Sequence, residues 1–199
     1  MTHSLPQFPP LFPIGRWWRL FLSRRLEGFS RDDAVAAANK ESAIRPRDWM
    51  RMALAQNTRI SLPVRGGASA LKNHHPETWY MAQEVVHENR KVVATVATVY
   101  GQMPYSRFLS DVCIPVKPGA EGMVKASEVC LQAFERVVSL LELDDDYLLD
   151  QLRDKTLSPT PSFKCICNDF NKNFNPELSI VDALMRLGKD AIFVLVPSF

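Results

Sequence analysis

Arginine side chains that could hold an anion are concentrated in the first third of this 199-residue chain. Residues 1–65 contain eleven Lys and Arg against five Asp and Glu, a balance of +6, whereas residues 66–199 contain thirteen against seventeen, a balance of −4. A basic segment of this kind attracts phosphate backbones, anionic lipid or an acidic protein. It can equally dock on the acidic part of its own chain, where the stretch ELDDDYLLDQLRD supplies six carboxylates and one arginine.

Two adjacent tryptophans stand among these arginines, in the stretch RWWRLFLSRR. Trp and Arg dominate interface hot spots, so the segment favours binding of a protein partner. The same residues suit a helix lying on an anionic membrane, and they also suit packing against the protein's own domain. We expect the partner-binding residues to be Trp17, Trp18, Arg16, Arg19, Arg24, Arg25, Arg47 and Arg51.

The segment that follows has the proportions of a helix-turn-helix. A helix over 31–41, the turn SAIRP and a helix over 47–56 would place Arg47, Arg51 and, just past the helix, Arg59 near phosphates. Gln56 or Asn57 would then reach base edges. An ordinary helical hairpin that caps a sheet, with its arginines in solvent, is the simpler interpretation. The pattern therefore admits nucleic acid as a partner, behind protein.

A glycine pair in PVRGGASALK provides a second potential anion site. Glycines between a strand and a helix expose backbone N–H groups, and basic neighbours add charge. The predicted phosphate-binding residues are Arg65, Gly66, Gly67 and Lys72. The spacing differs from that of a P-loop, and an ordinary glycine turn explains it as well.

A third stretch, HENRK at residues 87–91, follows the apolar QEVV and precedes IPV at 114–116. Over about 30 residues it resembles the strand–loop–helix box of the ParB/sulfiredoxin superfamily, although it lacks the glycine that usually opens that loop. The resemblance implies nucleotide or DNA-phosphate chemistry, with Arg90 on phosphate and Glu88 or His87 as polar partners. These three residues are the candidates for catalysis.

Metal and cofactor sites are not expected. The four cysteines are too few and too irregularly spaced for a disulfide framework, and they favour reduced thiols and a cytoplasmic address. Cys165 and Cys167 are one residue apart, which is not the spacing of a redox pair or a zinc knuckle. The adjacent His74 and His75 are poorly placed to share one ion. Cys113 lies in an apolar pattern that predicts an inert core thiol.

The N-terminal segment contains the longest uncharged run, which extends over residues 5–15 and includes four prolines. A membrane-spanning helix needs about 20 apolar residues, so this run cannot cross a bilayer. Because no basic stretch precedes it and proline interrupts it, it is not expected to be a secretory signal either. We expect an extended arm that packs across the domain.

The chain thus predicts an α+β fold: a mixed sheet of four or five strands with packed helices, preceded by the proline-rich arm and three short helices. Its predicted parts are the arm 1–15, a basic helical segment 16–57 and a core 58–199, together one structural domain. The expected helices cover 16–26, 31–41, 47–56, 77–90, 123–143, 145–153 and 176–188. The expected strands cover 59–64, 110–116, 163–167 and 190–196. Residues 91–100 are ambiguous, because their valines and threonines favour a strand while nothing marks a break from the helix before them, and the strand is preferred.

These observations favour a non-catalytic regulatory or accessory protein that binds another macromolecule through its basic N-terminal third. A protein partner is preferred over nucleic acid, and peripheral contact with an anionic membrane is a further alternative. The enzymatic alternative is a small phosphate-handling enzyme, a DNase or NTPase, built around the site that resembles the ParB/sulfiredoxin superfamily.

Overall fold

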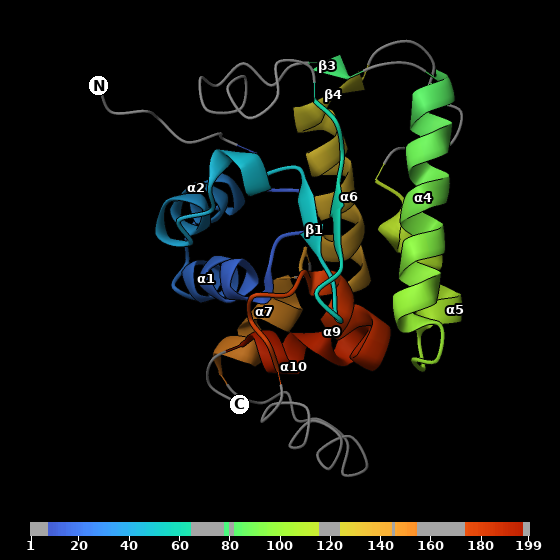
Figure 1. Ribbon diagram of the computed structural model, residues 1–199. Helices are drawn as coiled ribbons and strands as arrows, with labels where there is room; N and C mark the ends of the chain where they lie inside the picture. The colour runs from blue at the N-terminus through green and yellow to red at the C-terminus, as the bar shows by residue number, and fades with distance from the viewer. Residues whose placement is uncertain are drawn as a thin grey trace.

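The computed structural model describes residues 8–64, 78–79, 82–115, 124–144, 146–154 and 174–196. Most of these residues lie in helices, and the described strands form two separate antiparallel pairs, β1 with β2 and β3 with β4 (Figure 1). The expected mixed sheet of four or five strands is therefore wrong. The strands are β1 (Arg51–Ala53), β2 (Arg59–Ser61), β3 (Thr78–Trp79) and β4 (Val124–Lys125).

Five expected helices are confirmed. Ser30 begins α2 as predicted, because its side chain accepts a hydrogen bond from the backbone N–H of Asp33. Gly188 ends α9 with a φ of 61°, a conformation that favours glycine. The confirmed helices are α1 (Gly15–Leu26), α2 (Arg31–Glu41), α6 (Ala126–Leu140), α7 (Asp146–Arg153) and α9 (Ile180–Leu187).

The largest correction concerns residues 91–100, for which a strand was preferred over a helix and which instead complete the helix α4 (Ala82–Tyr100). No glycine or proline interrupts this stretch, and Val92 and Val96 are buried at helical spacing. The Thr95 hydroxyl donates a hydrogen bond to the Lys91 carbonyl at 2.7 Å, so the side chain fits the helix. Helix propensities of Val and Thr are below that of Ala by less than about 1 kcal/mol, which packing overrides.

Three shorter elements also differ from expectation. Residues 47–56 form no α-helix, because the 3₁₀ turn η1 (Pro46–Asp48) is followed by a turn at residues 49–50 and then by β1. Residues 110–116 begin with a 3₁₀ turn, η2 (Ser110–Cys113), next to the short helix α5 (Ser106–Leu109). Residues 190–196 belong to η3 (Gly188–Ala191) and α10 (Ile192–Leu195), and the expected strand at 163–167 lies outside the described residues.

An aromatic cluster joins the N-terminal helices to α6. Trp17 and Trp18 are fully buried, and Phe134 stacks on Trp18 with ring centroids 5.3 Å apart. Phe134 also meets Trp17 and Phe21 edge-on, at 5.9 Å and 5.4 Å. Each such pair contributes about 0.5–1.5 kcal/mol beyond the area that it buries. The cluster therefore holds α1 against the centre of the fold.

The described part of the proline-rich arm packs across the protein's own surface, as expected. The Leu11 N–H donates to the Trp49 carbonyl at 2.9 Å. On the other side of the arm, the Ser179 hydroxyl donates to the Phe12 carbonyl at 3.0 Å. The arm thus lies between the segment before β1 and the beginning of α9, and it forms one wall of the pocket described below.

A buried polar network connects α4, α9 and the β1–β2 turn. The Tyr100 hydroxyl accepts a hydrogen bond from the Ala55 N–H at 2.9 Å and donates to the Asp182 carboxylate. Asp182 also pairs with Arg186 at 3.1 Å. Desolvation of the phenol, with the nearby Asp182 charge as the second cause, raises the pKa of Tyr100.

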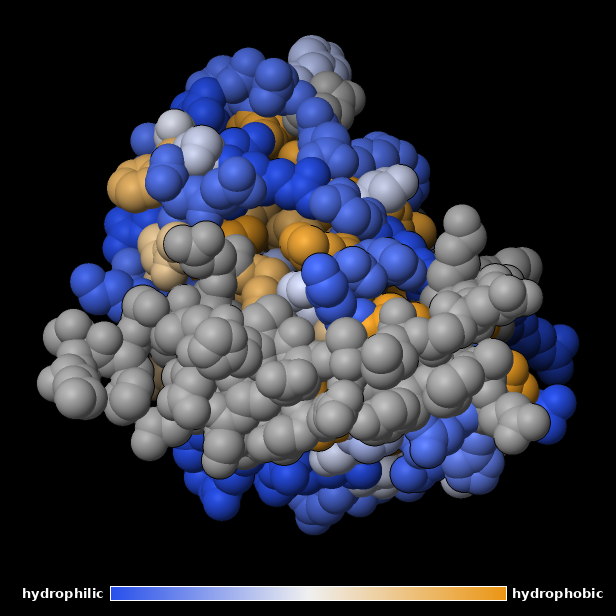
Figure 2. All heavy atoms as spheres, turned by 90° about the horizontal axis from the view of Figure 1, so that it is seen from above, coloured by the Kyte–Doolittle hydropathy of each residue, from blue (hydrophilic) through white to orange (hydrophobic). Residues whose placement is uncertain are grey.

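Seen from above, the described surface is mainly hydrophilic, with apolar residues showing between the polar ones (Figure 2).

Candidate functional site: an arginine-lined pocket

The arm, the segment 43–48 and the β1–β2 hairpin line an open pocket of about 330 Å³, here called the arginine pocket. Its charged lining residues are Arg16, Arg45, Asp48, Arg51, Arg59 and Glu177. They come from α1, the segment before η1, η1 itself, both strands of the hairpin and the segment before α9. Residues distant in the sequence are therefore brought to one concave site.

Strand alternation explains how the hairpin contributes its two arginines. Along β2, Arg59 and Ser61 are exposed while Ile60 is buried, and along β1 Met52 is buried between two more accessible residues. Successive side chains on a strand point to opposite faces. Because Met52 opposes Ile60, and Arg51 opposes Ser61, Arg51 lies on the same outer face as Arg59.

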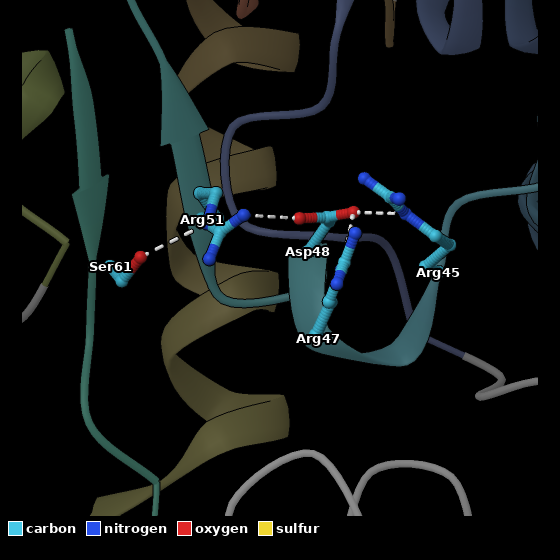
Figure 3. A network of polar contacts seen from close by, with 5 residues as sticks. All are labelled: Arg45, Arg47, Asp48, Arg51 and Ser61. Atoms are coloured by element: carbon cyan, nitrogen blue, oxygen red, sulfur yellow. Dashed lines mark hydrogen bonds and ion pairs between the residues drawn. The ribbon is translucent and has the colours of Figure 1, made fainter.

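Asp48 is the centre of the charge network (Figure 3). One carboxylate oxygen accepts from Arg51 Nη1 at 2.6 Å, and the other accepts from Arg45 Nε at 2.8 Å. Arg47 Nε lies 3.9 Å from that second oxygen. Arg51 is fixed further because its Nε donates to the Ser61 hydroxyl at 3.1 Å. Three guanidinium groups thus converge on a single carboxylate.

The remaining charges leave the pocket electropositive. Arg16 Nε lies 3.4 Å from a Glu177 carboxylate oxygen, and both side chains are about half exposed. Within the described ranges, the guanidinium group of Arg59 makes no hydrogen bond or ion pair. Counting Arg47, five guanidinium groups face two carboxylates, which leaves a surplus of three positive charges. Such a concave basic site concentrates anions.

Part of the pocket lining is apolar. It is formed by residues 10–14 of the arm together with Ala43 and Ile44. The arm side chains are mostly buried, whereas Ile14 and Ile44 are half-buried and present apolar surface at the pocket. A ligand that fits both parts of the lining carries a negative charge beside an apolar group.

The arginines predicted to bind a partner separate into two groups. Arg16 and Arg51 line the pocket, and Arg47 lies beside it. The other three hold the protein's own structure. Arg19 donates from Nε and Nη2 to the Val194 carbonyl at 3.2 and 2.9 Å, and its burial lowers its pKa.

Arg24 pairs with Glu27 and Glu41, each at 2.7 Å, while Arg25 donates to the Phe29 carbonyl at 2.9 Å. These contacts explain why both arginines belong to the surface of α1 rather than to the pocket. The two tryptophans are also internal, since neither Trp17 nor Trp18 exposes any of its surface.

Basic residues also dock on the acidic part of the chain, as one of the sequence alternatives anticipated. Arg31 on α2 pairs with Glu135 and lies 3.1 Å from Asp144. Within the acidic stretch, Arg153 Nε donates to the Leu26 carbonyl at 3.0 Å. Internal docking therefore uses Arg31 and leaves the pocket arginines out.

Sequence reasoning missed three pocket residues: Arg45, Asp48 and Glu177. Arg59 was anticipated only as a phosphate contact beside the expected second helix, not as part of a pocket. The alternation in RIS at 59–61 was a usable signal for Arg59, because it separates one buried residue from two exposed ones. Glu177 is more than a hundred residues away along the chain, and nothing in the sequence connects it to Arg16.

The candidate catalytic residues do not form the expected phosphate loop. His87, Glu88 and Arg90 lie inside α4, well after its first residue, so the strand–loop–helix arrangement implied by the resemblance is wrong here. Lys91 Nζ lies 3.6 Å from a Glu88 carboxylate oxygen, an ordinary pair within the helix. The second helix of the helix-turn-helix does not exist either. The predicted phosphate-binding residues Arg65, Gly66, Gly67 and Lys72 lie outside the described residues.

Thiol and metal chemistry find little support in the part of the chain that the structure describes. Cys113 and Cys130 are buried thiols, and desolvation raises the pKa of Cys113 to about 12 and also raises the pKa of Cys130. Across the described ranges, His, Cys, Asp and Glu nowhere gather in a group of three that could hold a metal ion.

None of the helices in the described segments is both long enough and apolar enough to cross a bilayer.

Comparison with known proteins gives no match: no family model fits the chain, and no curated protein or solved structure is significantly similar to it. The geometry of the pocket is thus the basis for a functional proposal.

Proposed function

We propose that this protein is a non-catalytic accessory or regulatory module, acting in the cytoplasm, that binds an anionic protein partner through the arginine pocket. The observation that carries the proposal is the convergence of Arg16, Arg45, Arg51 and Arg59 on one pocket with a surplus of positive charge. Arginine suits this role because its planar fork donates two parallel hydrogen bonds to one carboxylate or phosphate.

The chemistry of the pocket supports binding rather than catalysis. Both of its carboxylates are paired with arginines, Asp48 with Arg45 and Arg51, and Glu177 with Arg16. Within the described residues, the Ser61 hydroxyl accepts from Arg51 and has no hydrogen bond to Asp48 or Glu177, so neither carboxylate is placed as a general base beside it. A pocket that holds charge in place serves recognition.

The mixed lining favours a protein over nucleic acid. A nucleic-acid backbone presents a row of phosphates, and the carboxylates of Asp48 and Glu177 would repel those next to the one that is bound. The apolar surface of Ile14 and Ile44 offers a polar sugar–phosphate chain no favourable contact, whereas an apolar side chain of a protein segment can pack against it.

Fluorescence anisotropy with a fluorescein-labelled decaglutamate peptide tests this proposal. We expect binding at 50 mM salt that weakens as salt is added, because exposed charges are screened. The double variant Arg45→Gln/Arg59→Gln should weaken binding at least about tenfold, since each lost charge-assisted bond contributes about 1.5 kcal/mol or more. A 20-nucleotide oligothymidylate should bind more weakly than the peptide.

The matched control is Arg107→Gln, which removes one exposed arginine on α5 that does not line the pocket. Its affinity should stay within about twofold of the wild type, and circular dichroism should show the same fold for all three proteins. The control removes one charge and the double variant two, so a free-energy loss in the control half as large as that in the double variant would show that binding follows net charge alone and would refute the proposal.

A further inference from the structure

The Asp48 carboxylate is an anion that the pocket already binds through its arginines. Its two oxygens are both occupied, one by Arg51 and the other by Arg45, with Arg47 nearby. This single carboxylate neutralises one of the three converging charges. A second carboxylate, supplied by a partner, would still leave part of the surplus positive charge of the pocket unbalanced. A ligand group with more negative charge than one carboxylate therefore fits the pocket better.

From this balance we infer that the pocket takes a phosphate monoester on a side chain of the partner protein, an inference that rests on the proposed function. A phosphorylated side chain carries about −1.5 to −2 charges at neutral pH and offers three acceptor oxygens. The Arg59 guanidinium group, which has no partner among the described residues, supplies a fork for those oxygens, and so do the half-exposed Arg16 and the exposed Arg45.

A phosphodiester fits this pocket less well than a monoester. A diester carries one negative charge, and its neighbours along a nucleic acid would meet Glu177 or Asp48. The apolar side chains of Ile14 and Ile44 face the same space, which adds contact for a ligand with an apolar group beside the phosphate. The charge balance and the apolar wall therefore favour the same ligand class.

Phenyl phosphate and phenyl sulfate form a matched pair of probes, because they share a shape and differ in charge at pH 7.5. We expect the phosphate to bind about fivefold more tightly than the sulfate, measured from the shifts of arginine Nε–Hε signals in NMR titrations. Lowering the pH to 5.5 should remove most of this preference, because the second phosphate pKa is near 6. Phenyl sulfate at both pH values reports any change in the protein itself.

Two variants with opposite expected effects on affinity test whether phenyl phosphate binds in the arginine pocket. Glu177→Gln removes the carboxylate 3.4 Å from Arg16, at a side chain that is about half exposed, and should tighten phenyl phosphate binding about twofold. Arg59→Gln should weaken it at least fivefold, while Arg107→Gln should leave it unchanged. Inorganic phosphate should bind severalfold more weakly than phenyl phosphate, since it lacks the apolar group.

The outcomes separate this inference from the proposed function. Equal binding of phosphate and sulfate, with decaglutamate still bound through Arg45 and Arg59, overturns the phosphate inference and leaves the proposed function standing. Loss of decaglutamate binding overturns both. Tighter binding of the oligothymidylate than of phenyl phosphate, compared per phosphate group, overturns the choice of a protein partner in favour of nucleic acid.

Discussion

The Tyr100 hydroxyl makes the buried contact whose removal tests the fold most sharply. Tyr100→Phe deletes one oxygen, which accepts from the Ala55 N–H at 2.9 Å and donates to the Asp182 carboxylate. A neutral hydrogen bond contributes about 1 kcal/mol to stability and one to a charged group about 1.5–3 kcal/mol. We therefore expect the variant to lower the free energy of unfolding by about 2.5–4 kcal/mol.

Urea unfolding followed by circular dichroism measures this loss, with Tyr105→Phe as the matched control. Tyr105 loses the same atom from an exposed ring whose hydroxyl makes no hydrogen bond within the described residues. The control should change the free energy of unfolding by less than about 0.5 kcal/mol. If Tyr100→Phe costs no more than the control, the network that connects α4, α9 and the hairpin turn is incorrect.

Three further predictions concern stability. Phe134→Ala should lower the free energy of unfolding by about 3–5 kcal/mol, because it leaves a cavity in the aromatic cluster. Leu131→Ala, at the exposed side of α6, should lower it by less than about 1 kcal/mol, and urea unfolding of both variants measures the difference. Gly188→Ala should destabilise more than Gly28→Ala, since both have positive φ but only Gly188 places the new Cβ 2.7 Å from the Tyr105 ring; equal losses of melting temperature would contradict this. The free energy of unfolding should fall as pH rises above about 9, because folding raises the pKa of Cys113 to about 12 and the folded protein keeps a proton that the unfolded chain releases. In urea titrations at several pH values, Cys113→Ala should reduce the slope of the unfolding free energy against pH by up to about 1.4 kcal/mol per pH unit.

Periodicity in the sequence was sufficient to predict five helices but not to separate strands from helices in short apolar runs. The residues of α6 alternate between buried and exposed at helical spacing, so its identity was readable. The run DAIFVLV contains no such contrast, and its apolar residues are all buried in the structure. A stretch that is buried on every side fits a core helix as well as a core strand, and length alone did not decide between them.

The site was only partly readable for a related reason. A cluster of arginines indicates a basic surface, yet each arginine's role depends on what lies opposite it in space. Arg19 reaches the Val194 carbonyl, 175 residues away, while Arg16 reaches Glu177 at the pocket. No local pattern distinguishes these two arginines, which stand one helical turn apart on α1.

Tryptophan is ambiguous in the same way. Trp17 and Trp18 have the composition of an interface anchor, and the structure instead places them against Phe134 in the core. A fully buried pair next to an aromatic residue of α6 could be anticipated from the apolar face of α1, on which both tryptophans lie. The arginines of that segment then have to be considered apart from the tryptophans.

The central claim is that the arginine pocket is where the protein binds an anionic partner. Its most direct test is an NMR titration of the uniformly labelled protein with decaglutamate, in which the arginine Nε–Hε signals are assigned individually. We predict that the signals of Arg45, Arg51 and Arg59 shift in a saturable manner while those of Arg24 and Arg25 stay in place. Saturable shifts at Arg24 and Arg25, with the pocket arginines unchanged, would contradict the claim.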